Sequence, residues 1–132
     1  MAVILIVDDN EFFNDSLTRC LKQNVKNIVV LKALNGKVGT EIMRSIVVDL
    51  IITDLQMPVM NGYDLINYRN QYHPHIPLIV ISADTAQDVL DGLKARGVNE
   101  WVEKPCECKD VADLAVKILD KGKTATESVL IP

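Results

Sequence analysis

The sequence predicts an α/β fold, a doubly wound five-stranded parallel sheet with helices on both faces. Three observations lead to this prediction. Short apolar runs alternate along the chain with amphipathic helical patterns, which is the order expected of repeated βα units. The runs are almost continuously Val, Ile and Leu, as strands covered on both faces must be. The chain has 132 residues, which suits one domain with one core.

Five segments are predicted to be strands. Residues 2–7 (AVILIV), 48–53 (VDLIIT) and 77–82 (PLIVIS) have the composition of fully buried strands. Residues 28–33 (IVVLKA) and 99–103 (NEWVE) are less apolar, which favours positions nearer the edges of the sheet.

Helical patterns fill the gaps between these strands. Their apolar residues recur at spacings of three and four, which is typical of helices that face a core. A less regular pattern follows Gly62, and Gly97 is predicted to end the fourth helix. Because crossovers between parallel strands are right-handed, the helices should cover both faces. The other four stripes are Phe13, Leu17, Cys20 and Leu21; Val38, Ile42 and Ile46; Ala86, Val89, Leu90 and Leu93; and Val111, Leu114, Ala115, Ile118 and Leu119.

The domain is predicted to span residues 1–120, with a C-terminal tail or linker at residues 121–132 that is polar and then briefly apolar. The net charge of −4, with acids and bases mixed, gives no basic stripe for direct nucleic-acid binding. The apolar runs are too short to span a bilayer, and the first residues lack the basic region of a signal peptide. We therefore expect a cytoplasmic protein that does not contact a membrane.

The cysteines Cys20, Cys106 and Cys108 fit this location, because an odd number of thiols without an export signal indicates reduced cysteines. A metal or redox site at Cys106 and Cys108 would need a second pair of Cys or His at metal spacing, which the sequence lacks. We interpret the two as ordinary thiols near the start of a helix.

Polar residues end or follow four of the five predicted strands. Asp8 and Asp9 follow the first strand, Asp54 follows the third, Ser82 ends the fourth, and Lys104 follows the fifth. In an open parallel sheet, ligands bind at the carboxyl ends of the strands, where the strand order reverses. With a flavodoxin-like order 2-1-3-4-5, the first and third strands are neighbours. The three acids would then share one pocket.

Three carboxylates in one pocket need a cation nearby, or some of them must take up protons. Two such charges about 4 Å apart repel by roughly 4 kcal/mol at an effective dielectric constant of about 20. Mg²⁺ suits the pocket, because this ion prefers one or two carboxylates together with a phosphate. Lys104 would add a fixed positive charge, and Ser82 a hydroxyl donor. We expect Asp54 to be a nucleophile that attacks phosphorus and forms an acyl phosphate.

Each of these residues also has an ordinary structural interpretation. Asp9 or Asn10 could cap the first helix, Ser82 could cap the fourth, and Lys104 could simply be solvated. Four such residues at four carboxyl ends of one sheet favour a shared function over four separate coincidences.

Four motifs resemble the response-regulator receiver domain of two-component signalling. They are ILIVDDN, LIITDLQMPVMNG, LIVISA and WVEKP, and the likeness covers about residues 3–120. The resemblance implies that Asp54 accepts a phosphoryl group from a phosphohistidine on a sensor histidine kinase or a histidine phosphotransfer protein. It also implies that Asp9 binds Mg²⁺ directly, that Asp8 binds it mainly through water, and that Gln56 contributes its backbone carbonyl.

The resemblance assigns roles to the rest of the pocket as well. Ser82 would donate to the phosphoryl group, Lys104 would pair with it, and Ala83 would leave the pocket open. The Lys104–Pro105 peptide would be cis. Trp101 stands where the family has a switch aromatic, usually Tyr or Phe; it could equally be a partner-binding anchor or a plain edge-strand residue. The face formed by the fourth helix, the fifth strand and the fifth helix would bind a downstream target, a missing output domain or a second copy of the chain.

Two rival functions share this topology. An Mg²⁺-dependent aspartyl phosphohydrolase of the haloacid-dehalogenase type needs a second Asp two residues after its nucleophile, and this chain has Gln56 there. A flavin-binding module needs a loop rich in glycine and hydroxyl groups after the first strand, where this chain has DDNEFF. We therefore expect a receiver and not an enzyme, with self-phosphorylation and slow autodephosphorylation as its only chemistry.

Overall fold

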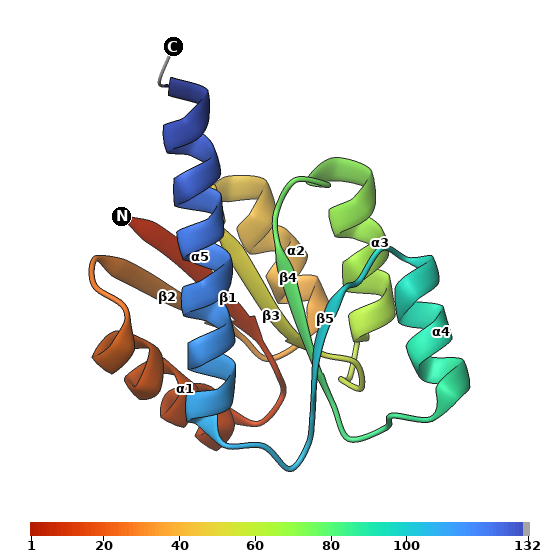
Figure 1. Cartoon of the computed structure of the whole chain (residues 1–132). Helices are drawn as coiled ribbons and strands as arrows, with labels where there is room; N and C mark the ends of the chain where they lie inside the picture. Colours follow the sequence, from red (N-terminus) through yellow and green to blue (C-terminus); the bar gives the residue numbers. More distant parts are fainter. Residues whose placement is uncertain (131–132) are drawn as a thin grey trace.

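The computed structural model describes the backbone of residues 1–130 and the side chains of residues 1–121. A five-stranded parallel sheet lies between two layers of helices (Figure 1). The strands are β1 (Ala2–Val7), β2 (Ile28–Ala33), β3 (Leu50–Asp54), β4 (Leu78–Ser82) and β5 (Glu100–Glu103), in the order β2-β1-β3-β4-β5. The helices are α1 (Glu11–Asn24), α2 (Gly36–Ser45), α3 (Gly62–Tyr72), α4 (Gln87–Ala95) and α5 (Cys108–Leu130). The predicted fold class and strand order are confirmed.

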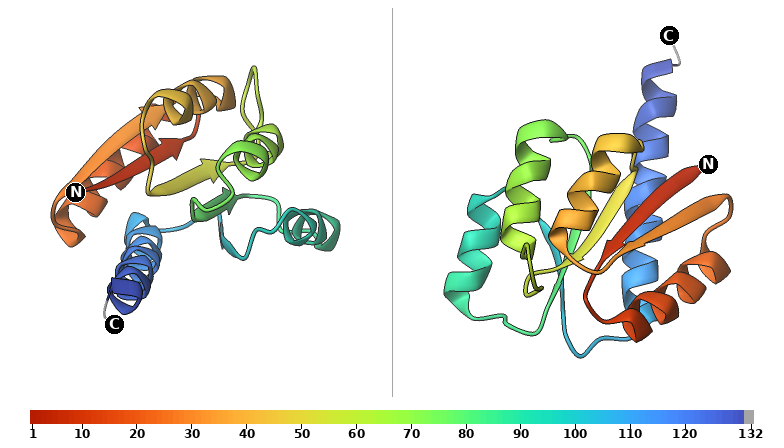
Figure 2. Two further views of the ribbon diagram at one scale, coloured as in Figure 1. Left: turned by 90° about the horizontal axis from the view of Figure 1, so that it is seen from above. Right: turned by 180° about the vertical axis from the view of Figure 1, so that it is seen from behind.

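The two faces of the sheet carry separate apolar clusters, because successive strand residues point in opposite directions. Ile4 and Ile6 of β1 pack in the cluster that contains buried residues of α1 and α5. Leu5 and Val7 pack in the cluster that contains residues of α2, α3 and α4. The end-on view in Figure 2 shows these helices on opposite sides of the sheet. This sandwich leaves the two ends of the strands as the places where polar groups can collect.

Strand β3 begins later than predicted, at Leu50 and not at residue 48. The reason is Asp49, whose carboxylate Oδ2 accepts a hydrogen bond of 2.7 Å from Val3 N. The main-chain N–H of Asp49 donates in turn to Val3 O at 2.8 Å. A side chain therefore replaces a ladder bond at this point, and regular pairing of β3 with β1 starts one residue later.

Three helices begin with an asparagine N-cap, at the side of the sheet where the carboxyl ends of the strands lie. The side-chain oxygens of Asn10, Asn35 and Asn61 accept hydrogen bonds of 3.0 Å from backbone N–H groups in the first turns of α1, α2 and α3. The cap expected of Asn10 is thus confirmed. Helix α4 has Ala86 at its N-cap and no side-chain cap bond, so the alternative that Ser82 caps α4 is wrong.

Gly97 ends α4 by adopting a left-handed backbone with φ of 79°. Its N–H donates to Lys94 O at 3.0 Å, and Val98 N donates to Leu93 O, also at 3.0 Å. These two bonds form a Schellman motif, which favours glycine at this position. The predicted helix stop is therefore present, one residue beyond the cap residue Arg96.

Helix α5 continues to Leu130 and so passes the domain boundary expected near residue 120 (Figure 1). The last part of the expected tail, residues 131–132, lies outside the described residues. The division of the chain at residue 120 stays a prediction. Among the residues that the structure describes, no helix is both long enough and apolar enough to cross a membrane.

Two glycines hold the loop that follows β3. Gly36 N donates to Met60 O at 2.9 Å, and Gly62 N donates to Leu55 O at 2.8 Å. A Cβ on Gly62 would overlap the main-chain oxygen of Asp54 and would lie 2.7 Å from Leu55 Cα. Both clashes are with backbone atoms, which cannot move aside as a flexible side chain can. The close approach of α3 to the end of β3 therefore requires glycine at position 62.

We expect Gly62→Ala to lower the free energy of unfolding by about 2 kcal/mol, since the new methyl group has no space. Gly92→Ala is the matched control: it lies inside α4, and its Cβ would meet only the end of the Arg96 side chain, at 3.3 Å. Helix propensity predicts that this change raises the free energy of unfolding by about 0.5–1 kcal/mol. Urea unfolding of both variants measures the two values, and equal effects would contradict the proposed clash.

Candidate functional site

Lys104 joins the carboxyl ends of β1 and β3. Its Nζ donates hydrogen bonds to Asp8 Oδ2 at 2.9 Å and to Asp54 Oδ2 at 3.1 Å. Asp8 directly follows β1, Asp54 is the last residue of β3, and Lys104 directly follows β5. Because the strands are parallel, all three ends lie at one edge of the sheet. This edge is called the carboxyl edge below.

The remaining carboxylate oxygens of Asp8 and Asp54 are held by backbone N–H groups. Asp8 Oδ1 accepts from Asn10 N at 3.0 Å, and Asp54 Oδ1 accepts from Leu55 N at 2.7 Å. The Asp8 side chain is 2% exposed, whereas those of Asp54 and Lys104 are 14% and 24% exposed. Asp8 is therefore an internal group, while Asp54 can still be reached from solvent.

The pKa of Lys104 reflects two opposing effects. Burial alone lowers it, but the hydrogen bonds and charge attraction from Asp8 and Asp54 outweigh burial and raise the pKa above its ordinary value. The Phe13 ring adds a further contact, with its centroid 5.0 Å from Lys104 Nζ. Lys104 is thus held in its charged form between two carboxylates.

Asp9 completes an acidic cluster with Asp8 and Asp54. One carboxylate oxygen from each of the three lies within 4.8 Å of the others, and Asp9 is exposed. Three negative charges share only one lysine, so the cluster retains a net negative charge that favours a cation. Carboxylate oxygens are the ligands that a hard divalent ion such as Mg²⁺ prefers. The donor set and its spacing therefore fit such an ion.

The other predicted site residues lie around this cluster. Ser82 is buried, and its hydroxyl donates to Asp84 O at 3.0 Å and accepts from Asp84 N at 3.1 Å. Its carbonyl accepts from Lys104 N at 2.8 Å, which joins the ends of β4 and β5. Ala83 and Gln56 are exposed in the loops after β4 and β3.

Trp101 lies on β5, three residues before Lys104, and is half-buried. Its ring packs with the cluster on the α2, α3 and α4 side of the sheet, and Lys94 Nζ of α4 lies 5.8 Å from the ring centroid. Trp101 therefore contacts the helix that follows β4 and not the carboxylates. The Lys104–Pro105 peptide bond is cis, the geometry that the resemblance implied.

The family model of the response regulator receiver domain matches residues 4–116. The chain belongs to this family. It is therefore a response regulator receiver domain of two-component signal transduction.

Curated relatives agree with this assignment, and a solved structure agrees with the fold. The chain is 33% identical over 129 residues to a protein-glutamate methylesterase/protein-glutamine glutaminase of Methanococcus maripaludis, covering 95% of the chain and 35% of that protein. It is 36% identical over 105 residues to the autoinducer 1 sensor kinase/phosphatase LuxN of Vibrio harveyi, covering 77% of the chain and 12% of that protein. The crystal structure of a CheY-like receiver domain from Methanospirillum hungatei has a TM-score of 0.86 at 21% identity, covering 95% of this chain and 98% of the other. This receiver thus spans only part of the length of these two relatives.

Sequence reasoning missed one buried polar residue beside the cluster. Asn14 is 1% exposed, and its Nδ2 donates to the main-chain oxygen of Asp8 at 2.9 Å. A signal was present in the sequence, because Asn14 shares the helical stripe of Leu17 and Leu21 at spacings of three and four. A polar residue on an apolar stripe marks a place where the core needs a hydrogen bond.

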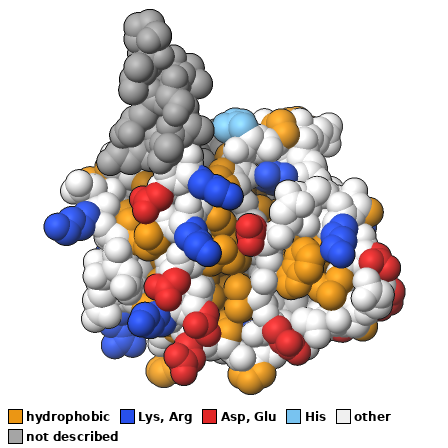
Figure 3. Space-filling model, in the orientation of Figure 1, with side chains coloured by type: hydrophobic (Ala, Val, Ile, Leu, Met, Phe, Trp, Pro, Cys, Tyr) orange, Lys and Arg blue, Asp and Glu red, His pale blue; other side chains and the backbone are white. Residues whose placement is uncertain are grey.

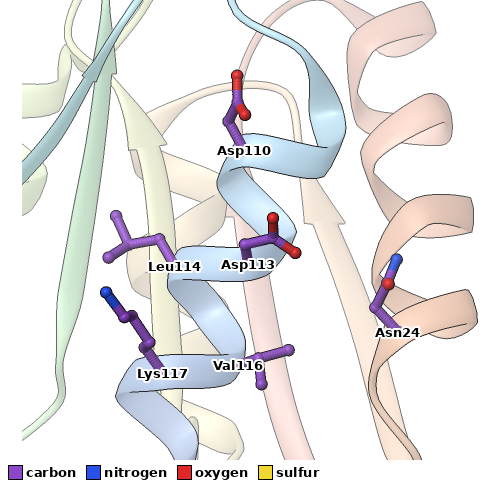
Figure 4. A pocket seen from close by; sticks show the side chains of 6 residues that line it. All are labelled: Asn24, Asp110, Asp113, Leu114, Val116 and Lys117. Atoms are coloured by element: carbon purple, nitrogen blue, oxygen red, sulfur yellow. The ribbon is translucent and has the colours of Figure 1, made fainter.

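Other features of this receiver lie away from the carboxyl edge. A hollow of about 530 Å³ is lined by α5 residues and by Asn24 at the end of α1 (Figure 4). None of the predicted site residues lines it. Burial raises the pKa of the Cys106 and Cys108 thiols, which disfavours the reactive thiolate. These observations agree with the interpretation of both cysteines as ordinary thiols.

The raised pKa of Lys104 predicts a specific pH dependence of stability. Because the folded pKa exceeds the unfolded value of about 10.4, the stabilisation is complete below that pH and is lost as pH rises through the folded pKa. At pH 7 without divalent ions, Lys104→Met should be less stable than wild type by about 2 kcal/mol. Urea unfolding at several pH values should show this difference shrinking above about pH 10.4. A difference that grows with pH would contradict the ion-pair geometry.

Proposed function

We propose that this receiver accepts a phosphoryl group on Asp54 from a phosphohistidine, in the presence of Mg²⁺. The donor would be a sensor histidine kinase or a histidine phosphotransfer protein. The observation that carries the proposal is the contact of Lys104 with both Asp8 and Asp54, at 2.9 and 3.1 Å. This contact brings an accessible carboxylate, a fixed cation and two further acids to one edge of the sheet.

The chemistry needs only one bond to form and one to break. A carboxylate oxygen of Asp54 forms the bond to phosphorus, and the phosphorus–nitrogen bond of the donor breaks with its electron pair leaving on the histidine nitrogen. Asp8, Asp9, Asp54 and the backbone carbonyl of Gln56 would hold Mg²⁺, which would offset charge on the phosphoryl oxygens. Lys104 already neutralises the same edge and would pair with the new group.

Ser82 and Ala83 would respond to the phosphoryl group. The Ser82 hydroxyl now bonds to both polar backbone atoms of Asp84. Donating to a phosphoryl oxygen would release Asp84 O and draw the β4–α4 loop toward the pocket, while Ala83 is too small to block it. Phosphorylation turns the single negative charge of the Asp54 carboxylate into nearly two on the phosphoryl group and adds strong acceptor oxygens, a change that can reorder a loop. Trp101, packed on the α4 side of β5, would sense the shift.

The face formed by α4, β5 and α5 is the surface that such a shift would change. In Figure 3 this face shows apolar side chains exposed among interspersed acidic and basic ones. A mixed surface of this kind suits a protein partner, and the described side chains of this face, up to residue 121, form no basic stripe for nucleic acid. The partner would be a downstream protein, an output domain or a second copy of the receiver. A cytoplasmic location remains part of the proposal.

An aspartyl phosphohydrolase is the weaker candidate. That reaction needs a carboxyl group two residues after the nucleophile to act as acid and base. Gln56 occupies the position here with an exposed amide, which cannot exchange a proton in that way. The chain is therefore proposed to turn over its own acyl phosphate slowly and not to act on other substrates.

Acetyl phosphate with Mg²⁺ should add one phosphoryl group to the wild-type chain. The Asp54 carboxylate can be reached from solvent, and Lys104 lies beside it to offset the negative charge of the incoming phosphoryl group. Asp54→Asn removes the nucleophile and should abolish the addition. Intact-mass spectrometry measures both. Asp64→Asn is the control, since it removes an exposed acid of α3 outside the cluster and should label like wild type. Equal labelling of wild type and Asp54→Asn would refute the assignment of Asp54.

Mg²⁺ should stabilise the folded receiver, because binding relieves repulsion within the acidic cluster. At a concentration one hundred times the dissociation constant, the gain is about 2.7 kcal/mol. Asp9→Asn should lose most of this gain, whereas Asp113→Asn on the exposed side of α5 should retain it. Thermal unfolding with and without Mg²⁺ compares the variants. Retention of the full gain by Asp9→Asn would exclude Asp9 as a ligand.

A further inference from the structure

Asp8 is fixed at every polar atom it has. Its main-chain N–H donates to Ala33 O at 3.1 Å, and its carboxylate oxygens accept from Asn10 N and Lys104 Nζ. Its main-chain oxygen accepts from Asn14 Nδ2 at 2.9 Å. The Asn14 bond is the only one of the four made by a neutral side chain, so it can be removed without altering charge or backbone.

Asn14 is an unexpected residue for its place in the fold. It lies in the second turn of α1, is 1% exposed, and is aligned with the core residues Leu17 and Leu21. Among the residues whose side chains are described, none donates to its buried Oδ1. A leucine of similar volume would remove this unpaired acceptor, but it would also take away the donor to the main-chain oxygen of Asp8. The asparagine therefore serves the main chain of Asp8 and not the apolar stripe on which it lies.

We infer that Asn14 is a positioning residue for the divalent cation, acting through Asp8. The inference rests on the proposed function. Asn14 bonds the carbonyl of Asp8 to α1. This bond fixes the backbone conformation of the segment after β1 that carries Asp8 and Asp9. The spacing of the carboxylate cluster, with its oxygens within 4.8 Å of one another, depends on that chain direction. Partners that orient metal ligands typically change metal affinity by 10- to 100-fold when removed.

The test compares Asn14→Leu with wild type in the full chain. Isothermal titration with Mg²⁺ should give a dissociation constant raised about tenfold in Asn14→Leu. Urea unfolding in EDTA should give a midpoint close to that of wild type, because removal of the unpaired Asn14 Oδ1 offsets loss of the donor to Asp8 O. Amide exchange without metal should be faster at Asn10 in the variant, since the carboxylate that accepts its N–H is less firmly held. A purely structural residue would instead lower the midpoint and leave the dissociation constant unchanged.

Two further variants keep the result unambiguous. Asn14→Gln retains an amide donor on a longer side chain, so its dissociation constant for Mg²⁺ should lie above that of wild type and below that of Asn14→Leu, and the comparison with wild type still tests the role of Asn14 if the leucine variant does not fold. Thr40→Val is the matched control, because Thr40 is a buried polar residue of α2 whose hydroxyl donates to Lys37 O at 2.8 Å, within its own helix. It should bind Mg²⁺ like wild type.

The failure of this inference can be told apart from the failure of the proposed function. Wild-type affinity for Mg²⁺ in Asn14→Leu, with normal exchange at Asn10, overturns the role of Asn14 and leaves the proposed function standing. Absence of Mg²⁺ binding by wild type overturns both. A loss of affinity that is as large in Thr40→Val as in Asn14→Leu also overturns the inference, because it would then reflect general destabilisation.

Discussion

The carboxyl edge of the sheet depends on one charge balance, the pairing of Lys104 with Asp8 and Asp54. All five strands end at this edge, and the ends of β1 and β3 carry acids that would repel each other without the lysine. Lys104 reaches the pair from β5, which is separated from β1 by two other strands in the sheet. The strand order therefore matters to the site, because it places β1 beside β3 and so brings their acids together within reach of the lysine.

The elements around this edge differ in how many contacts fix them. Helices α1, α2 and α3 are well fixed, whereas α4 and the β4–α4 loop are held by few contacts. Helices α1, α2 and α3 start with asparagine caps, and Asp8 and Asp54 are each held by backbone N–H groups. Helix α4 has no side-chain cap, buries only Leu93, and follows a loop held by Ser82 and by an exposed bond of Thr85 to Glu103 at 3.2 Å. A new charge at Asp54 would therefore displace the β4–α4 side, since opening a weakly packed element requires the least free energy.

The sequence was sufficient for the fold and for the convergence of the charged residues, because both follow from simple rules. Alternation of apolar runs and helical stripes indicated the sheet, and the rule of carboxyl ends brought Asp8, Asp54 and Lys104 together. The features that could not be predicted from the sequence depend on particular contacts. The start of β3 is set by the bond of Asp49 to Val3, and the role of Asn14 depends on which main-chain oxygen its amide meets. A periodic pattern predicts which face of a helix a residue occupies, but not which atom its side chain bonds to.

Three locally unfavourable features collect at this one edge. The acids crowd together, Asn14 buries an unpaired oxygen at a cost of about 1–3 kcal/mol, and Val59 holds a φ of 69° that a β-branched residue rarely adopts. Val59 lies in the loop between Asp54 and the glycine that contacts it, so its strain is on the same segment. Elsewhere most of the predicted apolar stripes pack in the two cores, but the stripe Val38, Ile42 and Ile46 is wrong in part, because Val38 is 38% exposed and Ile46 is 43% exposed. Although Asn27, just before β2, also has a positive φ of 57°, the conflicts that gather at the carboxyl edge are the pattern expected of a binding site. The acids, the lysine and the asparagine at this edge are therefore best understood together, because each of them bonds to Asp8 or shares its carboxylate cluster.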